Sequence, residues 1–137
     1  MTNNYFKEMI RLADSIADQA HSGQTDKIGR PYITHPRRVA FAVRKLAPEN
    51  MRVEAQIVAL LHDTVEDTGV TLDYLARYFS VSIVDAVDAL TKRKGETLEQ
   101  SIARVRANEL ARLVKHADIA DNTDPERIFR LDEDTRK

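Results

Sequence analysis

Residues 60–68 read Leu60-Leu61-His62-Asp63-Thr64-Val65-Glu66-Asp67-Thr68, and they are the most informative stretch of the chain. They follow an apolar stretch with helical periodicity, so an imidazole and a carboxylate stand at the buried end of a helix. Glu66 and Asp67 come three and four residues after Asp63, which is the same-face spacing if the helix continues. Packing gives no reason for four polar groups here, whereas a metal-centred hydrolytic site requires them.

Helical periodicity recurs on both sides of this segment, and no run shows convincing strict alternation of apolar and polar residues. Gly and Pro number only four each in the chain. We therefore predict an all-α fold with a polar loop over residues 23–34. The predicted helices cover residues 6–20, 35–46, 51–67, 72–79 and 84–90, one that begins at Thr97, and residues 109–121.

Capping residues are expected at several of these helix starts. Thr34 can cap a helix whose first position is His35 or Pro36. Thr97 with Gln100 has the pattern of a capping box. Two further caps are predicted for the short helices that follow residue 70, namely Thr71 for the first and Ser82 or Ser80 for the second.

The length and composition favour a single globular domain over residues 1–137. Hydrophobic residues make up 42% and charged residues 31%, which is typical of a soluble protein. The charged tail, residues 126–137, is expected either to fray or to begin a helix that the chain does not complete.

The charge and the cysteine content exclude several function classes. The formal net charge is -1, so no overall field recruits nucleic acid or an anionic membrane. The chain has no cysteine, which excludes disulfides, thiolate zinc sites and a cysteine nucleophile. The first residues have no apolar signal core and no run approaches a membrane span, so a cytoplasmic location is expected.

Four residues are candidate metal ligands: His35, His62, Asp63 and Asp118. His62 and Asp63 are adjacent, about 100° apart around a helix, so both side chains can lean toward one point. Two imidazoles and two carboxylates form a mixed nitrogen and oxygen set that suits Mn²⁺, Fe²⁺, Ni²⁺ or Zn²⁺ with open positions. The absence of sulfur argues against a closed structural zinc site.

Each candidate ligand can also be given a structural role that involves no metal. His35 can be a polar residue at a helix start, and Asp118 can be a buried acid paired with Lys115. The His62-Asp63 pair is harder to explain in this way, because a buried acid needs a partner. His21 and His116 are expected to be ordinary polar or capping residues.

The chain resembles the RelA/SpoT-type hydrolase domains, which are HD-domain metal-dependent phosphohydrolases. The resemblance covers roughly residues 5–125 and rests on four motifs in the family's order. These are residues 20–36 (AHSGQTDKIGRPYITHP), 59–68 (ALLHDTVEDT), 88–92 (DALTK) and 115–122 (KHADIADN).

The resemblance implies an all-α HD fold in which one divalent ion, usually Mn²⁺, is held by His35, His62, Asp63 and Asp118. Glu66 and Asp67 correspond to the family's Glu-Asp pair, which positions or deprotonates the attacking water. The implied substrate is guanosine tetra- or pentaphosphate, (p)ppGpp, cleaved at the 3′ position to release pyrophosphate. Synthetase and regulatory domains do not fit in 137 residues, so the implied enzyme only degrades its substrate.

Phosphate binding requires cations, and the resemblance points first to Lys27 in the polar loop. Lys92 and Lys115 are further candidates, each with a simple surface role as the alternative. Asn122 matches a family asparagine near the nucleoside and can hydrogen-bond ribose or phosphate. For Tyr32, packing is the expected role.

Two departures from the family pattern concern substrate recognition. Asp26 stands where the family carries an arginine near the guanine base, which removes a stacking surface and adds repulsion toward phosphates. After Asn122, Asp124 stands where another cationic contact is usual.

Three hypotheses therefore remain open. They are a Mn²⁺-dependent (p)ppGpp pyrophosphohydrolase, an HD phosphohydrolase of another nucleotide or phosphoester, and a catalytically silent nucleotide-binding module. The oligomeric state is not predicted.

Overall fold

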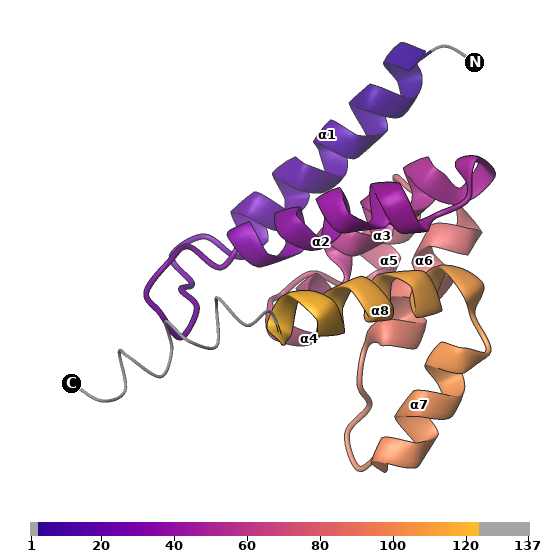
Figure 1. The fold of residues 1–137 in the computed structure, drawn as a ribbon. Helices are drawn as coiled ribbons and strands as arrows, with labels where there is room; N and C mark the ends of the chain where they lie inside the picture. Colours follow the sequence, from indigo (N-terminus) through magenta and orange to yellow (C-terminus); the bar gives the residue numbers. More distant parts are fainter. Residues whose placement is uncertain (1–2, 124–137) are drawn as a thin grey trace.

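In the computed structural model, which describes residues 3–123, every regular element is a helix (Figure 1). No β-strand occurs over residues 3–123, where Thr25 and Pro31 form an isolated bridge. The all-α prediction is confirmed, while the predicted tail over residues 126–137 lies outside the described part. The helices are α1 (Asn3–Ala20), α2 (Thr34–Leu46), the 3₁₀ turn η1 (Glu49–Met51), α3 (Arg52–Leu61), α4 (Thr64–Asp67), α5 (Leu72–Ala76), α6 (Val81–Leu90), α7 (Leu98–Arg106) and α8 (Glu109–Asn122).

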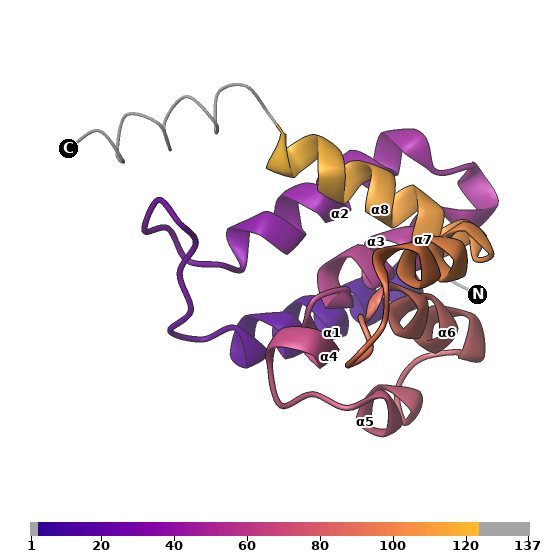
Figure 2. The same ribbon diagram turned by 90° about the horizontal axis from the view of Figure 1, so that it is seen from below.

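Helix α3 is the centre of the molecule, and buried apolar residues lie on nearly all sides of it. It packs against α1, α2, α6 and α8, which surround it in both views of the fold (Figures 1 and 2). Ile57, Val58 and Leu61 are fully or almost fully buried. Burying each such side chain contributes about 1.5–3 kcal/mol, so the position of α3 is firmly determined.

The prediction of one helix over residues 51–67 was wrong. The chain forms η1 first, then α3, then a turn at His62 and Asp63, and then the single turn α4. Thr64 Oγ1 donates to the Leu61 carbonyl at 2.8 Å and His62 Nδ1 lies 2.5 Å from the Ala59 carbonyl. These local side-chain contacts compete with the continuing helix ladder, and they turn residues 62 and 63 toward α2 and α8.

Some of the predicted helix caps are confirmed and others are not. The capping box of Thr97 and Gln100 is confirmed, and Thr71 accepts a hydrogen bond from the Tyr74 amide as predicted. Thr34 is not a cap, because α2 begins at Thr34 itself and its hydroxyl donates to the Pro31 carbonyl at 2.9 Å. The helix α6 begins after Ser80 rather than Ser82, and the Ser80 hydroxyl makes no capping bond.

The start of α2, the end of α3 and the last turns of α8 meet at one side of the molecule. The loop between α1 and α2 projects beside them (Figure 2). Segments that are far apart in the sequence thus supply one region of the surface. Within the described part, none of the helices has the length and apolar character needed to cross a membrane.

Candidate metal centre

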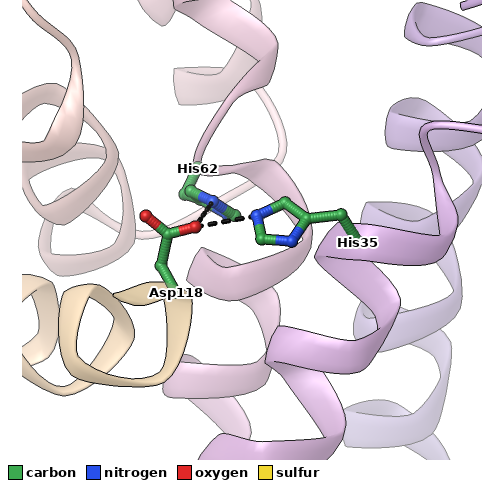
Figure 3. Close-up of side chains that lie close together, drawn as sticks. All are labelled: His35, His62 and Asp118. Atoms are coloured by element: carbon green, nitrogen blue, oxygen red, sulfur yellow. Dashed lines mark hydrogen bonds and ion pairs between the residues drawn. The ribbon is translucent and has the colours of Figure 1, made fainter. Parts of the chain in front are cut away.

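His35, His62 and Asp118 converge from three different elements (Figure 3). His35 lies in the first turn of α2, His62 directly follows α3, and Asp118 belongs to α8. Asp118 Oδ1 lies 2.7 Å from His35 Nε2 and 3.4 Å from His62 Nε2. The three ligand atoms lie within 4.8 Å of one another and all three residues are buried.

Asp63, the fourth predicted ligand, lies at the same place. Its Oδ2 atom is 3.2 Å from His62 Nε2 and 4.0 Å from His35 Nε2. The Tyr32 hydroxyl donates a hydrogen bond of 2.6 Å to that same oxygen. The structure therefore brings together all four residues that the sequence singled out.

The donor atoms fit a divalent cation. His62 Nδ1 lies against the Ala59 carbonyl and is therefore the protonated nitrogen in the neutral ring. In that neutral form the buried Nε2 atom is an acceptor: it has no hydrogen-bond partner among the described residues, and the carboxylate oxygens of Asp63 and Asp118 lie 3.2 and 3.4 Å away. An unsatisfied imidazole nitrogen that faces two carboxylates is the arrangement that metal coordination requires.

Strong electrostatic coupling holds this cluster together. Burial lowers the pKa of His62, but the Asp118 and Asp63 carboxylates outweigh burial and raise it to about 10. Burial raises the pKa of Asp63, and the His62 imidazolium and the Tyr32 hydroxyl outweigh it and lower that pKa to about 2. The pKa of Asp118 is likewise held below its usual range by His35 and His62 against the effect of burial. Such a site attracts positive charge, whether a proton or a metal ion.

Asp121 orients His35 by binding Nδ1, the ring nitrogen that does not face Asp118. Its Oδ2 atom lies 2.6 Å from His35 Nδ1, and Arg38 donates to both of its oxygens at 2.8 and 3.1 Å. A carboxylate on the distal nitrogen fixes the tautomer and the direction of a metal-binding imidazole. Sequence reasoning missed Asp121, although its position three residues after Asp118 on the same helix face was a usable signal.

A cavity of about 540 Å³ opens beside the cluster. The predicted catalytic residues Glu66 and Asp67 both line it. The Lys92 amide donates to Glu66 Oε1 at 2.8 Å and fixes that carboxylate. Partial burial, together with Asp63 and Glu66, raises the pKa of Asp67, and His21 and His62 oppose the rise. Asp67 is thus better suited than an isolated aspartate to accept a proton.

The predicted substrate-binding residues divide into two groups. Lys27 and Asn122 line the cavity, and the Asn122 amide donates to Asp118 Oδ1 at 3.3 Å. Lys92 and Lys115 are not part of the cavity lining. Lys92 reaches the site through its backbone amide, and Lys115 Nζ lies 3.4 Å from Asp118 Oδ2. Asp118 is therefore paired with Lys115, as the structural alternative expected, and it also lies among the candidate metal ligands.

Asp26 has a structural role that its departure from the family pattern did not suggest. Its Oδ1 atom accepts hydrogen bonds from the amides of Ile28 and Arg30 at 3.0 and 2.9 Å. It thereby shapes the loop that carries Lys27, and it also lines the cavity. Asp124, the second departure, lies outside the described residues.

Two expectations about single side chains need correction. Tyr32 was expected to pack, but its hydroxyl also binds Asp63. His21 was expected to be an ordinary polar residue, and it is buried, with its ring 4.8 Å from that of Tyr32 between centroids. His116 is exposed, in agreement with its expected role.

A family model described as "HD domain" matches residues 13–119. The chain belongs to the HD domain family. This membership agrees with the helical architecture and with the resemblance noted in the sequence.

A probable GTP pyrophosphokinase of Mycobacterium leprae is 34% identical over 94% of this chain and 17% of its own length. A guanosine-3′,5′-bis(diphosphate) 3′-pyrophosphohydrolase of Aquifex aeolicus is 34% identical over 95% of this chain and 19% of its own length. The chain thus spans less than a fifth of these two relatives.

A solved structure described as a metazoan ortholog of SpoT that hydrolyzes ppGpp has the same fold. The TM-score is 0.72 at 23% identity, over 91% of this chain and 78% of that chain. At this identity the match supports the HD fold observed for α1 to α8 and no more.

Proposed function

We propose that this HD domain is a metal-dependent phosphohydrolase that removes the 3′-pyrophosphate of (p)ppGpp, with Mn²⁺ as its ion. The observation that carries the proposal is the convergence of His35, His62, Asp63 and Asp118 beside a cavity lined by Glu66 and Asp67. The relative from Aquifex aeolicus carries the name of this activity, which supports the choice of substrate.

The residues of the chain divide the work of hydrolysis among them. A divalent ion held by the four ligands would supply Lewis-acid charge to a phosphoryl oxygen. Glu66, fixed by the Lys92 amide, orients the attacking water, and Asp67 with its raised pKa accepts the proton. Lys27 in the loop neutralises phosphate charge, and Asn122 donates to ribose or phosphate.

The test is a product analysis by mass after incubation of (p)ppGpp with the protein and Mn²⁺. The expected products are GDP or GTP and pyrophosphate. Glu66→Gln is expected to lower kcat about 100-fold or more with Mn²⁺ affinity retained. The exposed Glu99→Gln on α7 serves as the control. Absence of turnover at micromolar enzyme would rule out this substrate.

A second candidate is hydrolysis of a different nucleotide or phosphoester. It is favoured by Asp26, whose carboxylate lines the cavity where the family pattern has an arginine. A panel of nucleotides with Mn²⁺ separates the two, because release of orthophosphate instead of pyrophosphate identifies a phosphatase. If no member of the panel turns over while one of them binds, the silent nucleotide-binding module is the better description.

A further inference from the structure

His21 is a buried histidine that the proposed mechanism does not use. It follows α1 directly and is 3% exposed. Its Nδ1 atom pairs with Gln24 Oε1 at 2.8 Å, while its Nε2 atom is buried and has no hydrogen-bond partner among residues 3–123. A buried unmatched nitrogen costs about 1–3 kcal/mol, and an apolar side chain would fill the space without that cost. Packing alone therefore does not account for a histidine here.

Tyr32 connects His21 to the metal centre, because it contacts both the His21 ring and Asp63. The two ring centroids are 4.8 Å apart with the planes tilted by 47°. The Tyr32 hydroxyl then donates to Asp63 Oδ2 at 2.6 Å. A continuous path thus runs from the end of α1, through the loop before α2, to a candidate ligand that follows α3.

The orientation of Asp63 matters because a carboxylate can rotate. Oδ2 is the oxygen that lies 3.2 Å from His62 Nε2, and it is also the oxygen that Tyr32 holds. A hydroxyl donor fixes which oxygen faces the ion, and such supporting contacts change metal affinity about 10–100-fold when they are removed. The Tyr32 ring can hold this position only if its own packing is fixed.

We propose that His21 is a positioning residue of the metal centre: it holds the Tyr32 ring so that the hydroxyl keeps Asp63 Oδ2 directed at the ion. The inference rests on the metal site of the proposed function. It differs from that function in naming a residue outside the ligand and catalytic sets, and it can be tested without substrate.

The experiment is a double-mutant cycle on Mn²⁺ affinity, measured by titration calorimetry on the metal-free full chain. His21→Leu and Tyr32→Phe are each expected to weaken Mn²⁺ binding about tenfold. The double variant is expected to bind as Tyr32→Phe does, within about twofold, because the effect of His21 passes through the Tyr32 hydroxyl. His116→Leu, which changes an exposed histidine on α8, is expected to bind as the wild type does.

A second variant separates the ring contact from the bond to Gln24. The side-chain nitrogen of asparagine occupies about the place of Nδ1, so His21→Asn keeps the bond to Gln24 and loses the ring. This variant is expected to unfold in urea at nearly the wild-type midpoint and still to bind Mn²⁺ about tenfold more weakly. It also serves if His21→Leu fails to fold.

Three outcomes would overturn the inference. They are additive effects in the double variant, wild-type affinity in His21→Leu, and recovery of wild-type affinity in His21→Asn. Each of these leaves the proposed function intact, because the wild type still binds Mn²⁺. Absence of Mn²⁺ binding by the wild-type chain would overturn both proposals.

Discussion

Asp118 and Asp121 show how one turn of helix supplies both a candidate ligand and the support for another. Asp118 Oδ1 lies 2.7 Å from Nε2 of His35, and Asp121 Oδ2 lies 2.6 Å from Nδ1 of the same ring. Both nitrogens of His35 are thus bound by carboxylates of α8. Arg38 in turn holds Asp121, so the Nδ1 side of the imidazole is fixed by two groups that are not part of the cavity lining.

Asp121→Asn is predicted to weaken Mn²⁺ binding about 10–100-fold. The amide keeps the shape of the side chain but removes the charge that makes His35 a stronger ligand and that binds Arg38. Affinity is measured by calorimetry on the metal-free protein. Asp85→Asn, at an exposed position of α6, is the control and should bind as the wild type does. An unchanged affinity in Asp121→Asn would show that Asp121 does not support His35.

The residues that were predictable from sequence are those whose chemistry is unusual where they stand. Adjacent His62 and Asp63 at the end of an apolar helix attract attention in any sequence. His35 and Asp118 were also candidates from the sequence, and the family pattern implied the same four ligands. Tyr32 and Asp121 were not found in this way, because their roles arise from contacts across 31 and 86 positions. A tyrosine in a proline-containing loop has no feature that predicts a bond to a distant carboxylate.

At the scale of elements, the break between α3 and α4 is what the sequence pattern did not predict. Apolar periodicity runs through the turn, and Asp63 keeps right-handed backbone angles with φ −102° and ψ −4°. At the interruption, the side chains of His62 and Thr64 bind the carbonyls of Ala59 and Leu61 and compete with the backbone ladder there. Hydrophobic periodicity predicts which face of a helix is buried. It carries no information about side chains that compete for the backbone carbonyls.

Thr64→Val is predicted to destabilise the fold by about 1–3 kcal/mol, because it leaves the buried Leu61 carbonyl without the Thr64 hydroxyl. Thr64 itself is fully buried and valine has nearly the same shape, so little packing is lost. Urea unfolding measures the change. Thr64→Ser keeps the hydroxyl and should lose only about 1 kcal/mol, the contribution of one methyl group. Equal losses in the two variants would exclude the hydrogen bond as the cause.

The loop between α6 and α7 gives a prediction about pH. The Arg104 guanidinium donates to Glu96 and lowers the pKa of that carboxyl from 4.5 to about 2. The folded pKa lies below the unfolded one, so the contact stabilises the fold above pH 4.5 and is lost as the pH falls from there through about 2.

Glu96→Gln should therefore be less stable than the wild type at pH 6, and this difference should vanish as the pH approaches 2. Urea midpoints at several pH values provide the measurement. The matched control is Glu99→Gln, which changes a neighbouring exposed acid. A stability difference between wild type and Glu96→Gln that is constant with pH would contradict the prediction.

For the whole molecule, the candidate ligands join segments that are separated along the chain. His35 belongs to α2, His62 and Asp63 follow α3, and Asp118 belongs to α8. In the unfolded chain these donors are far apart, so an ion that needs all of them binds only the folded state. Metal binding and folding are therefore coupled.

This coupling predicts that Mn²⁺ raises the melting temperature. At a free concentration 100 times the Kd, the stabilisation is about 2.7 kcal/mol, which corresponds to a shift of roughly 10 °C for a domain of this size. EDTA should reverse the shift, and the shift should grow with the logarithm of the Mn²⁺ concentration. His62→Ala should abolish it, because that substitution removes the buried Nε2 atom that faces Asp63 and Asp118 and has no hydrogen-bond partner among the described residues. If His62→Ala kept the full Mn²⁺-dependent shift measured by calorimetry, the ion would bind elsewhere, and α2, α3 and α8 would not be held together through this centre.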